Sequence, residues 1–203
     1  MSASGEPPAT RIATGRGIRV CRGLRTLLDG VDLHVDAGEV LHLVGPNGCG
    51  KTTLLETLAG LFEAEAGELD LPPMHESIWI GHRHGFAPEL DARTNLALWC
   101  RLQGGDADRI ADAMQHWRVP RARNRALGAL SAGQQQRTAL ATLSLKPTAR
   151  LWMLDEPIAA LDRHAVPLLV AAIAAFCSAG GAVILTTHQP LDGLTVRVQE
   201  LAR

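Results

Sequence analysis

The chain has 203 residues, of which 46% are hydrophobic and 20% are charged, so it can bury a core as one large α/β domain or two small lobes. Its formal net charge of −1 gives no overall attraction to nucleic acid or anionic lipid, and we expect no nucleic-acid partner. Four widely spaced cysteines form no Cys-x-x-Cys pair, which argues against a disulfide framework or structural zinc and is typical of a reducing compartment.

The N-terminal segment is polar and basic. Its first ten residues lack the apolar core of a signal peptide, and we expect residues 1–15 to form a disordered tail before a single domain over residues 16–203. Only Glu6 balances a series of arginines: Arg11, Arg16, Arg19, Arg22 and Arg25. We interpret this basic arm as solvated surface, with contact to a phosphate or a partner as the alternative.

A strand, a glycine-rich loop and a helix follow one another in the first third of the chain. Val31, Leu33 and Val35 alternate with polar residues, which predicts a half-buried strand. The mostly apolar run at 40–44 predicts a second strand that is covered on both faces. Residues 51–59 are predicted to form a helix that ends before glycine.

The loop between that second strand and the helix matches the phosphate-binding motif G-x-x-x-x-G-K-[ST] at residues 45–52. Its glycines let successive backbone N–H groups point at phosphate oxygens, and the helix N-terminus adds its positive end to the same cavity. Lys51 is expected to reach the β- and γ-phosphates of ATP, and the Thr52 hydroxyl to ligate Mg²⁺. Cys49 is interpreted as a small filler of the loop. The predicted nucleotide-binding residues are Gly45, Pro46, Asn47, Gly48, Cys49, Gly50, Lys51, Thr52 and Thr53.

Further strands and helices alternate along the rest of the chain. Strands are predicted at 77–80, 150–154 and 182–187, and helices at about 94–103, 106–117, 131–145 and 163–178. This alternation indicates a largely parallel sheet with helices on its faces. Residues of about 84–148 lack a central strand and are expected to form a helical lobe beside the sheet.

One stretch of the chain resembles a membrane span in length. The 23 residues at 165–187 carry no charge, which passes a simple length criterion for a transmembrane helix. However, Pro167 stands near the start of this stretch, and the sequence Ser-Ala-Gly-Gly at 178–181 divides it. We therefore favour a buried helix followed by a β-branched strand from Ala182 to Thr187 over a membrane span.

Two adjacent carboxylates follow the predicted strand at 150–154. Ligands collect at the carboxyl ends of strands in open α/β sheets, so Asp155 and Glu156 lie where a nucleotide is expected. We expect Asp155 to hold Mg²⁺ through water, and Glu156 to polarise the attacking water as a catalytic general base. Alone, the pair also fits an acidic turn before Pro157, but beside a phosphate loop it favours nucleotide hydrolysis.

The segment Leu130–Arg137, with the sequence LSAGQQQR, resembles the signature sequence of ABC-type ATPases. The resemblance implies an α/β fold of the P-loop NTPase class, with a mostly parallel sheet, an antiparallel β part and a helical lobe. It also implies that Ser131 and Gly133 cap the γ-phosphate of ATP held by a second copy of the chain, since they have no evident use within their own subunit. Residues 159–162 resemble the D-loop at the dimer interface, and His188 resembles the catalytic switch histidine that contacts the γ-phosphate.

Four further segments resemble the haem-exporter ATP-binding subunits of bacterial cytochrome c maturation, the CcmA family: 78–82, 89–96, 151–157 and 184–191. The resemblance implies a transport ATPase bound peripherally at the cytoplasmic face of the bacterial inner membrane. Its partners would be integral membrane subunits of a haem-handling complex, and its cycle would drive release of a haem-loaded chaperone. No direct haem binding by this chain is expected. The alternatives are an ABC ATPase for another cargo, such as a lipid or a drug, and a soluble ABC protein of DNA repair or translation.

Two positions depart from the general ABC pattern. Arg83 stands where most such ATPases place a Mg²⁺-sensing glutamine; a guanidinium cannot ligate a cation, so His82 or His84 is the alternative sensor. A haem or metal site built from His75, His82 and His84 is a further hypothesis, which the absence of a Cys-x-x-Cys-His sequence disfavours. Arg22 falls at the usual adenine-stacking position, where its guanidinium plane is expected to stack on the base, with a solvated arm as the alternative.

Overall fold

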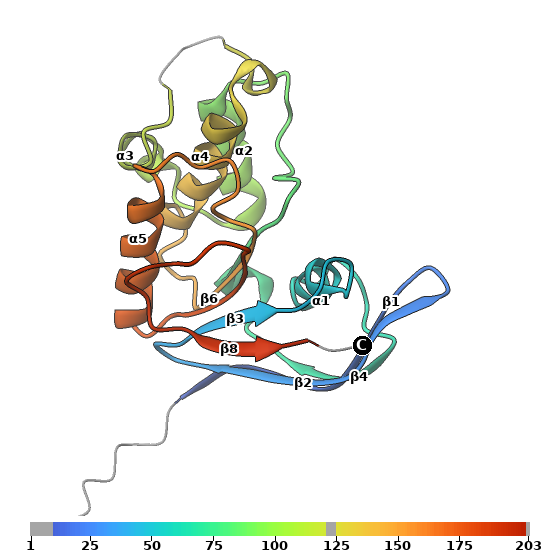
Figure 1. The fold of residues 1–203 in the computed structure, drawn as a ribbon. Coiled ribbons are helices and arrows are strands. Elements are labelled where there is room, and N and C mark those ends of the chain that lie inside the picture. Colours follow the sequence, from blue (N-terminus) through green and yellow to red (C-terminus); the bar gives the residue numbers. More distant parts are fainter. Residues whose placement is uncertain (1–9, 121–124, 202–203) are drawn as a thin grey trace, which may run out of the picture.

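The computed structural model describes residues 10–120 and 125–201, and these contain two sheets and a lobe built of helices (Figure 1). Residues 1–9 of the expected tail lie outside the described residues. The expected tail boundary at residue 15 is wrong, because residues 11–15 belong to a strand in which Ile12 and Ala13 are buried. Burial of these apolar side chains stabilises the strand, and a disordered tail would leave them in water.

Within the described residues, the larger sheet has five parallel strands in the order β5-β6-β7-β3-β8. Their bounds are β3 Val40–Val44, β5 Ser77–Ile80, β6 Leu151–Asp155, β7 Ala182–Thr186 and β8 Arg197–Glu200. Because the strands are parallel, the carboxyl ends of β3, β6 and β7 lie at the same edge of the sheet. The segments that follow these three strands contain the phosphate loop, the carboxylate pair and His188.

The smaller sheet is antiparallel with the order β2-β1-β4, and it confirms the expected antiparallel part. Its strands are β1 Arg11–Arg22, β2 Arg25–Asp36 and β4 Ala66–Asp70. The basic N-terminal segment is therefore the central strand of this sheet and not a free arm. Its apolar side chains Ile18 and Val20 are buried, while Arg19 forms an exposed ion pair with Asp29 whose Nε–Oδ1 distance is 2.7 Å.

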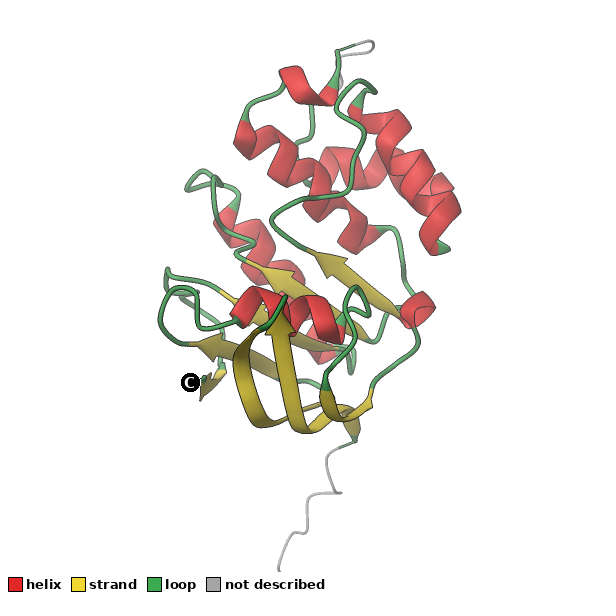
Figure 2. Cartoon of the chain, turned by 90° about the vertical axis from the view of Figure 1, so that its right-hand side faces the viewer, coloured by secondary structure: helices red, strands yellow, loops and turns green. Residues whose placement is uncertain are grey.

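Helices lie beside the larger sheet and in a lobe inserted between β5 and β6 (Figure 2). The described part of the lobe contains α2 Ala92–Gln103, α3 Ile110–His116 and α4 Ala132–Ala141, with the 3₁₀ turns η2 Ala107–Arg109, η3 Leu127–Ala129 and η4 Thr142–Ser144. Beside the sheet lie α1 Lys51–Leu58 and α5 Val166–Ser178, and η1 Met74–Glu76 precedes β5. The predicted helices are thus present, with small shifts at their ends.

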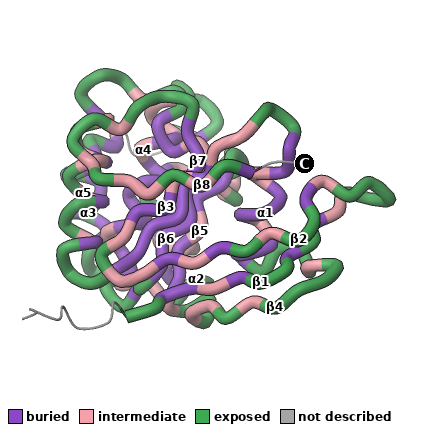
Figure 3. The backbone as a smooth tube through the Cα atoms, turned by 60° about the horizontal axis from the view of Figure 1, so that its bottom comes forward, coloured by how far each residue is buried: buried purple, intermediate pink, exposed green. Residues whose placement is uncertain are grey.

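Alternate residues of the central strands face two separate hydrophobic clusters. Leu41 and Ile184 belong to the cluster that includes α1 and the antiparallel sheet, whereas Val40 and Leu185 belong to the cluster that includes α5 and the lobe. In Figure 3, the central strands β3 and β6 are largely purple, the colour of buried residues. Both faces of β3 are covered, which agrees with the mostly apolar sequence that predicted this strand.

The uncharged stretch at 165–187 forms α5, a turn and β7, which confirms the helix-and-strand interpretation. The 13 residues of α5 span about 20 Å at the rise of an α-helix, which is shorter than a bilayer core. Across the described residues, none of the helices combines the length and the apolar character needed to cross a membrane.

Candidate functional site

The predicted phosphate loop connects β3 to α1, and its own lysine bonds back to its start. Nζ of Lys51 donates hydrogen bonds to the carbonyl oxygens of Gly45 at 2.7 Å and Pro46 at 3.1 Å. Gly50 precedes α1 with a φ of 115°, which favours glycine, and a Cβ there would lie 3.0 Å from the Cβ of Leu27. The lysine charge and the positive end of α1 therefore occur together at this loop.

Asp155 ends β6 with a buried side chain that links the phosphate loop to β7. Its Oδ2 accepts a hydrogen bond from the Thr52 hydroxyl at 2.9 Å, and its Oδ1 accepts one from the Thr186 hydroxyl at 2.7 Å. The adjacent hydroxyl and carboxylate oxygens are the hard ligands that Mg²⁺ prefers, so these residues fit the expected metal. Thr186 is a site residue that the sequence prediction missed. Its place at the end of the strand paired with β6 is the signal that could have found it.

Glu156 and His188 face each other next to this group. Glu156 has a φ of 50°, and its N–H is held by the carbonyl oxygen of Thr186 at 3.2 Å and by the Thr186 hydroxyl at 3.1 Å. A non-glycine residue in this left-handed region costs on the order of 1–3 kcal/mol, a strain that clusters at functional sites. Oε2 of Glu156 accepts from the backbone N–H of His188 at 3.3 Å, and Oε1 lies 3.5 Å from Nε2 of that ring. The strained turn therefore directs the predicted base toward the predicted switch histidine.

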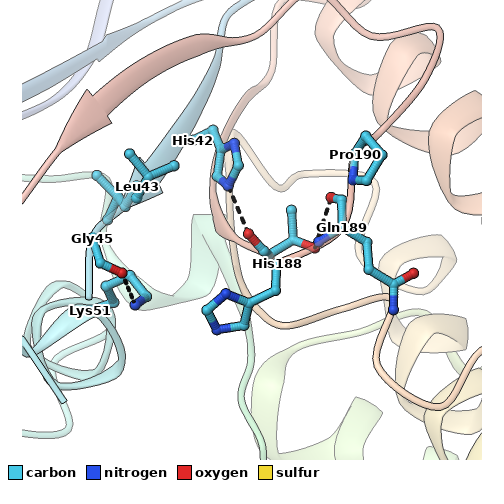
Figure 4. Close-up of a pocket in the computed structure, with 9 residues that line it drawn as sticks. His42, Leu43, Gly45, Lys51, His188, Gln189 and Pro190 are labelled. Atoms are coloured by element: carbon cyan, nitrogen blue, oxygen red, sulfur yellow. Dashed lines mark hydrogen bonds between the residues drawn. The ribbon is translucent and has the colours of Figure 1, made fainter. Parts of the chain in front are cut away.

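A cavity of about 330 Å³ opens between the phosphate loop and the segment after β7 (Figure 4). Lys51 and His188 line it from these two segments. His42 of β3 also lines it, and its Nε2 lies 3.1 Å from the carbonyl oxygen of Thr187. The cavity thus places the Lys51 amine and the His188 imidazole around a space large enough for phosphate groups, while Nε2 of His42 is turned to the Thr187 carbonyl.

The signature segment begins α4 and is absent from the described lining of this cavity. Ser131 caps the helix, because its hydroxyl accepts from the Gln134 N–H at 3.3 Å and its own N–H donates to Oε1 of Gln134 at 3.0 Å. This capping box leaves Ser131 and Ala132 exposed. The N-terminus of α4 is therefore available to an anion from outside this subunit.

The signature segment also has contacts within its own subunit. Gly133 lies so close to residue 160 that a Cβ on it would be 2.6 Å from the carbonyl oxygen of Ala160. Nη1 of Arg137 lies 3.3 Å from Oδ2 of Asp162, which fastens α4 to the same loop. The sequence-based argument that residues 131–133 lack a use within their own subunit is therefore wrong for Gly133, because the contact joins segments far apart in sequence.

The loop after β5 carries Arg83 between two histidines. Arg83 and His82 are exposed, and His84 is half-buried. These residues line a second cavity of about 520 Å³ together with residues of α4 and of the loop at 159–160. Burial lowers the pKa of His84 below its usual range, against an opposing contribution from the Gly81 carbonyl. A neutral imidazole can ligate a cation where a guanidinium cannot. A sensing role for His82 or His84 stays a prediction.

The alternative three-histidine site is not formed. His75 lies in η1, where its Nε2 is 3.8 Å from Oε1 of Glu76. His82 and His84 lie in the loop after β5. In the part of the chain that the structure describes, no three His, Cys, Asp or Glu residues are grouped so that they could hold a metal ion.

Arg22 is the exposed last residue of β1, opposite Arg25 in the hairpin that leads to β2. A few residues on, Leu27 and Leu28 lie against Gly50 of the phosphate loop. The hairpin is therefore a neighbour of the loop, and stacking of the Arg22 guanidinium on adenine stays a prediction.

Comparisons with known proteins identify the family of the chain. The sequence model of the ABC transporter family matches residues 28–159. The chain is 42% identical over 177 residues to the cytochrome c biogenesis ATP-binding export protein CcmA of Hyphomonas neptunium, which covers 87% of this chain and 90% of the relative. It is 38% identical over 207 residues to the protein of the same name from Pseudomonas syringae pv. syringae, which covers 96% of each chain.

Solved structures share the fold. An ABC transporter ATP-binding protein from Pyrococcus furiosus matches with a TM-score of 0.76 and 24% identity, over 93% of this chain and 96% of that one. A dimeric ATP-binding cassette in a post-hydrolysis state bound to ADP and Pi matches with a TM-score of 0.78 and 22% identity, over 94% of each chain. With the family match and the sequence relatives, the chain belongs to the ABC transporter ATP-binding family and, within it, to the cytochrome c biogenesis ATP-binding export proteins.

Proposed function

We propose that the chain is the ATP-hydrolysing subunit of an ABC transporter complex that serves cytochrome c maturation. The observation that carries this proposal is a pair of contacts between distant segments. Thr52 of the phosphate loop bonds to Asp155, and Glu156 bonds to His188. The two contacts join the segments after β3, β6 and β7 at one edge of the parallel sheet, where nucleotides bind in such folds.

ATP binding is assigned to residues 45–53. The loop N–H groups and the positive end of α1 attract the phosphates, and Lys51 exchanges its bonds with Gly45 and Pro46 for bonds with the β- and γ-phosphates. Mg²⁺, when bound, neutralises charge on the phosphates, and Thr52 and Asp155 are the residues that would hold it.

Hydrolysis is assigned to Glu156 and His188. A water oxygen attacks the γ-phosphorus while the bond to the β–γ bridging oxygen breaks, and the Glu156 carboxylate accepts the proton that the water loses. His188 holds the γ-phosphate so that it stays in line with the water. Oε2 of Glu156 bonds to the His188 backbone in this structure, so we assign Oε1 to the proton of the attacking water.

The other half of each ATP site is assigned to a second copy of the chain. Support comes from the N-terminus of α4, because Ser131 is exposed there and is not among the described residues that line the ATP cavity. In this arrangement Ser131 and Gly133 cap the γ-phosphate held by the facing subunit. Two ATP molecules then bridge the pair, and hydrolysis removes the phosphates that hold the subunits together.

The family supports our proposal for the cargo and the location. The relatives are named for cytochrome c biogenesis and export, so we assign the chain to integral membrane subunits that handle haem, with release of a haem-loaded chaperone as the output. The chain would bind them peripherally at the cytoplasmic face of the inner membrane, through the loop after β5 and the helical lobe.

The test is purification of the tagged full chain from native membranes, with its partners identified by mass spectrometry. The expected partners are integral membrane proteins of cytochrome c assembly. Cells that carry only a Lys51→Ala chain should lose their c-type cytochromes while retaining the complex. Recovery of a lipid or drug transporter with normal c-type cytochromes would assign the ATPase to another cargo. Fractionation of the chain wholly to the cytosol would instead favour a soluble ABC protein.

A further inference from the structure

His42 lies in the middle of β3, only three residues before Gly45 of the phosphate loop. It pairs in register with Leu185 of β7. Its half-buried ring reaches past the end of that strand, and its Nε2 lies 3.1 Å from the carbonyl oxygen of Thr187 (Figure 4). One side chain therefore links the strand that leads into the phosphate loop with the segment that carries His188.

The direction of this hydrogen bond is fixed by its acceptor. A carbonyl oxygen can only accept, so Nε2 of His42 carries a hydrogen and donates it. β7 ends at Thr186, which leaves the carbonyl of Thr187 beyond the bounds of that strand. Thr187 is buried, and an unpaired backbone carbonyl is costly in such surroundings. His42 supplies a partner at the point where the strand ends.

Two further contacts hold the same segment. Oγ1 of Thr187 accepts from the Gln189 N–H at 3.1 Å, which closes a local turn. Oε2 of Glu156 accepts from the His188 N–H at 3.3 Å. This second contact uses one oxygen of the carboxylate that hydrolysis requires, so it weakens when Glu156 takes up the proton of the attacking water. The bond from His42 uses no reacting group and persists through that step.

We propose that His42 is a positioning residue that fixes the backbone of Thr187 and thereby holds the His188 ring against the γ-phosphate while Glu156 activates water. The inference rests on the function proposed above. His42 acts through the main chain of Thr187 and not through contact with the nucleotide. Its removal should therefore lower the rate of hydrolysis and leave ATP binding nearly unchanged.

The experiment compares His42→Ala, His42→Asn and His42→Gln in the full chain, assayed in complex with its native membrane partners. The amide nitrogen of glutamine extends about as far from the backbone as Nε2 of histidine, whereas that of asparagine ends near the position of Nδ1. We expect His42→Ala and His42→Asn to lower kcat about fivefold, the factor for one hydrogen bond, with KM for ATP within about twofold of the natural value. His42→Gln should restore most of the lost kcat.

Thermal unfolding of each variant separates positioning from a general loss of structure. An unchanged kcat in His42→Ala overturns the inference. A loss of kcat that His42→Gln does not restore also overturns it. So does a loss of kcat that equals the unfolded fraction of the variant. A rise in KM with an unchanged kcat also overturns it, because that result would place His42 in ATP binding.

A Lys51→Ala chain distinguishes failure of the inference from failure of the proposed function. If Lys51→Ala hydrolyses ATP at the natural rate, the proposed function fails and this inference fails with it. If Lys51→Ala is inactive and His42→Ala retains full activity, the inference alone fails.

Discussion

The α-carbon of Gly133 lies against the carbonyl oxygen of Ala160, and a Cβ placed on that carbon would stand only 2.6 Å from the oxygen. Ala160 has a φ of 62°, which is uncommon for a residue other than glycine. Nearby, Nε2 of Gln136 donates a buried hydrogen bond to the carbonyl oxygen of Pro157 at 2.8 Å. The start of α4 and the loop after β6 are therefore held together, which couples the signature segment to Glu156.

Gly133→Ala should disturb this coupling, because the added methyl group meets a backbone carbonyl that cannot move without its loop. We expect ATP turnover to fall by about tenfold or more, while the ATP affinity of a single subunit changes little because its own phosphate loop is untouched. Steady-state hydrolysis assays and calorimetry with ATP measure the two quantities. Ala132→Gly is the matched control, since it alters the neighbouring exposed residue by the same methyl group. Equal turnover of the two variants would argue against the coupling.

Lys51→Ala should weaken ATP binding by about tenfold to a hundredfold, the range expected when a charged group loses its hydrogen bonds to phosphate. The fold should survive, because among the described residues the lysine bonds only to carbonyl oxygens of its own loop, those of Gly45 and Pro46. Calorimetry with ATP gives the affinity. Arg109→Ala removes a cation from an exposed ion pair in the lobe and should bind ATP normally. Unchanged affinity in Lys51→Ala would contradict the assignment of the phosphate loop.

Asp155→Asn should reduce the increase in ATP affinity that Mg²⁺ causes. The substitution keeps the shape of the side chain and an oxygen for the Thr186 hydroxyl, but it removes the negative charge beside Thr52. Calorimetry with ATP, in Mg²⁺ and again in EDTA, measures this difference for each chain. Asp112→Asn, on the exposed face of α3, serves as the control. If Mg²⁺ raises the ATP affinity of Asp155→Asn as much as that of the natural chain, Asp155 is excluded from the metal site.

Cys177 reports on the packing of α5 against the sheet. Burial raises the pKa of its thiol to about 11, so the reactive thiolate is scarce at pH 8. Cys21 on β1 is only half-buried. Iodoacetamide at pH 8 should therefore modify Cys21 much faster than Cys177 in the native chain, and both at similar rates in denaturant. Peptide mass spectrometry follows the two sites. Native modification of Cys177 should accelerate as the pH rises toward 11, and equal native rates at pH 8 would contradict this packing.

Much of the site could be predicted because its chemistry is local in sequence. Residues 45–52 hold the loop glycines, the lysine and the hydroxyl in one run. Apolar strands mark the points where Asp155 and His188 emerge from the sheet. Because the strands are parallel, their carboxyl ends lie at one edge of the larger sheet. Motifs that directly follow such strands in the sequence are therefore close together in space.

The features that escaped prediction depend on partners far away in sequence. β4 and β8 are short strands at sheet edges, and each has a single large apolar residue, Leu69 and Val198, so they lack the apolar alternation that marks a half-buried strand. Register shifts interrupt the alternation of β1, which made that strand resemble a charged arm. The bond from His42 to Thr187 joins residues 145 positions apart, and no local pattern encodes it.

In the proposed cycle, two copies of the chain close on ATP, and hydrolysis by Glu156 ends that state. The most direct measurement is the molar mass of the purified full-length Glu156→Gln chain by light scattering, with and without Mg²⁺ and ATP. Glu63→Gln, which changes an exposed residue after α1, is the control. We expect Glu156→Gln to form an ATP-dependent dimer and not to turn over ATP, while the control turns over ATP normally. A Glu156→Gln chain that hydrolyses ATP at the natural rate would rule out Glu156 as the base, and one that binds ATP and stays monomeric would rule out the ATP-bound dimer.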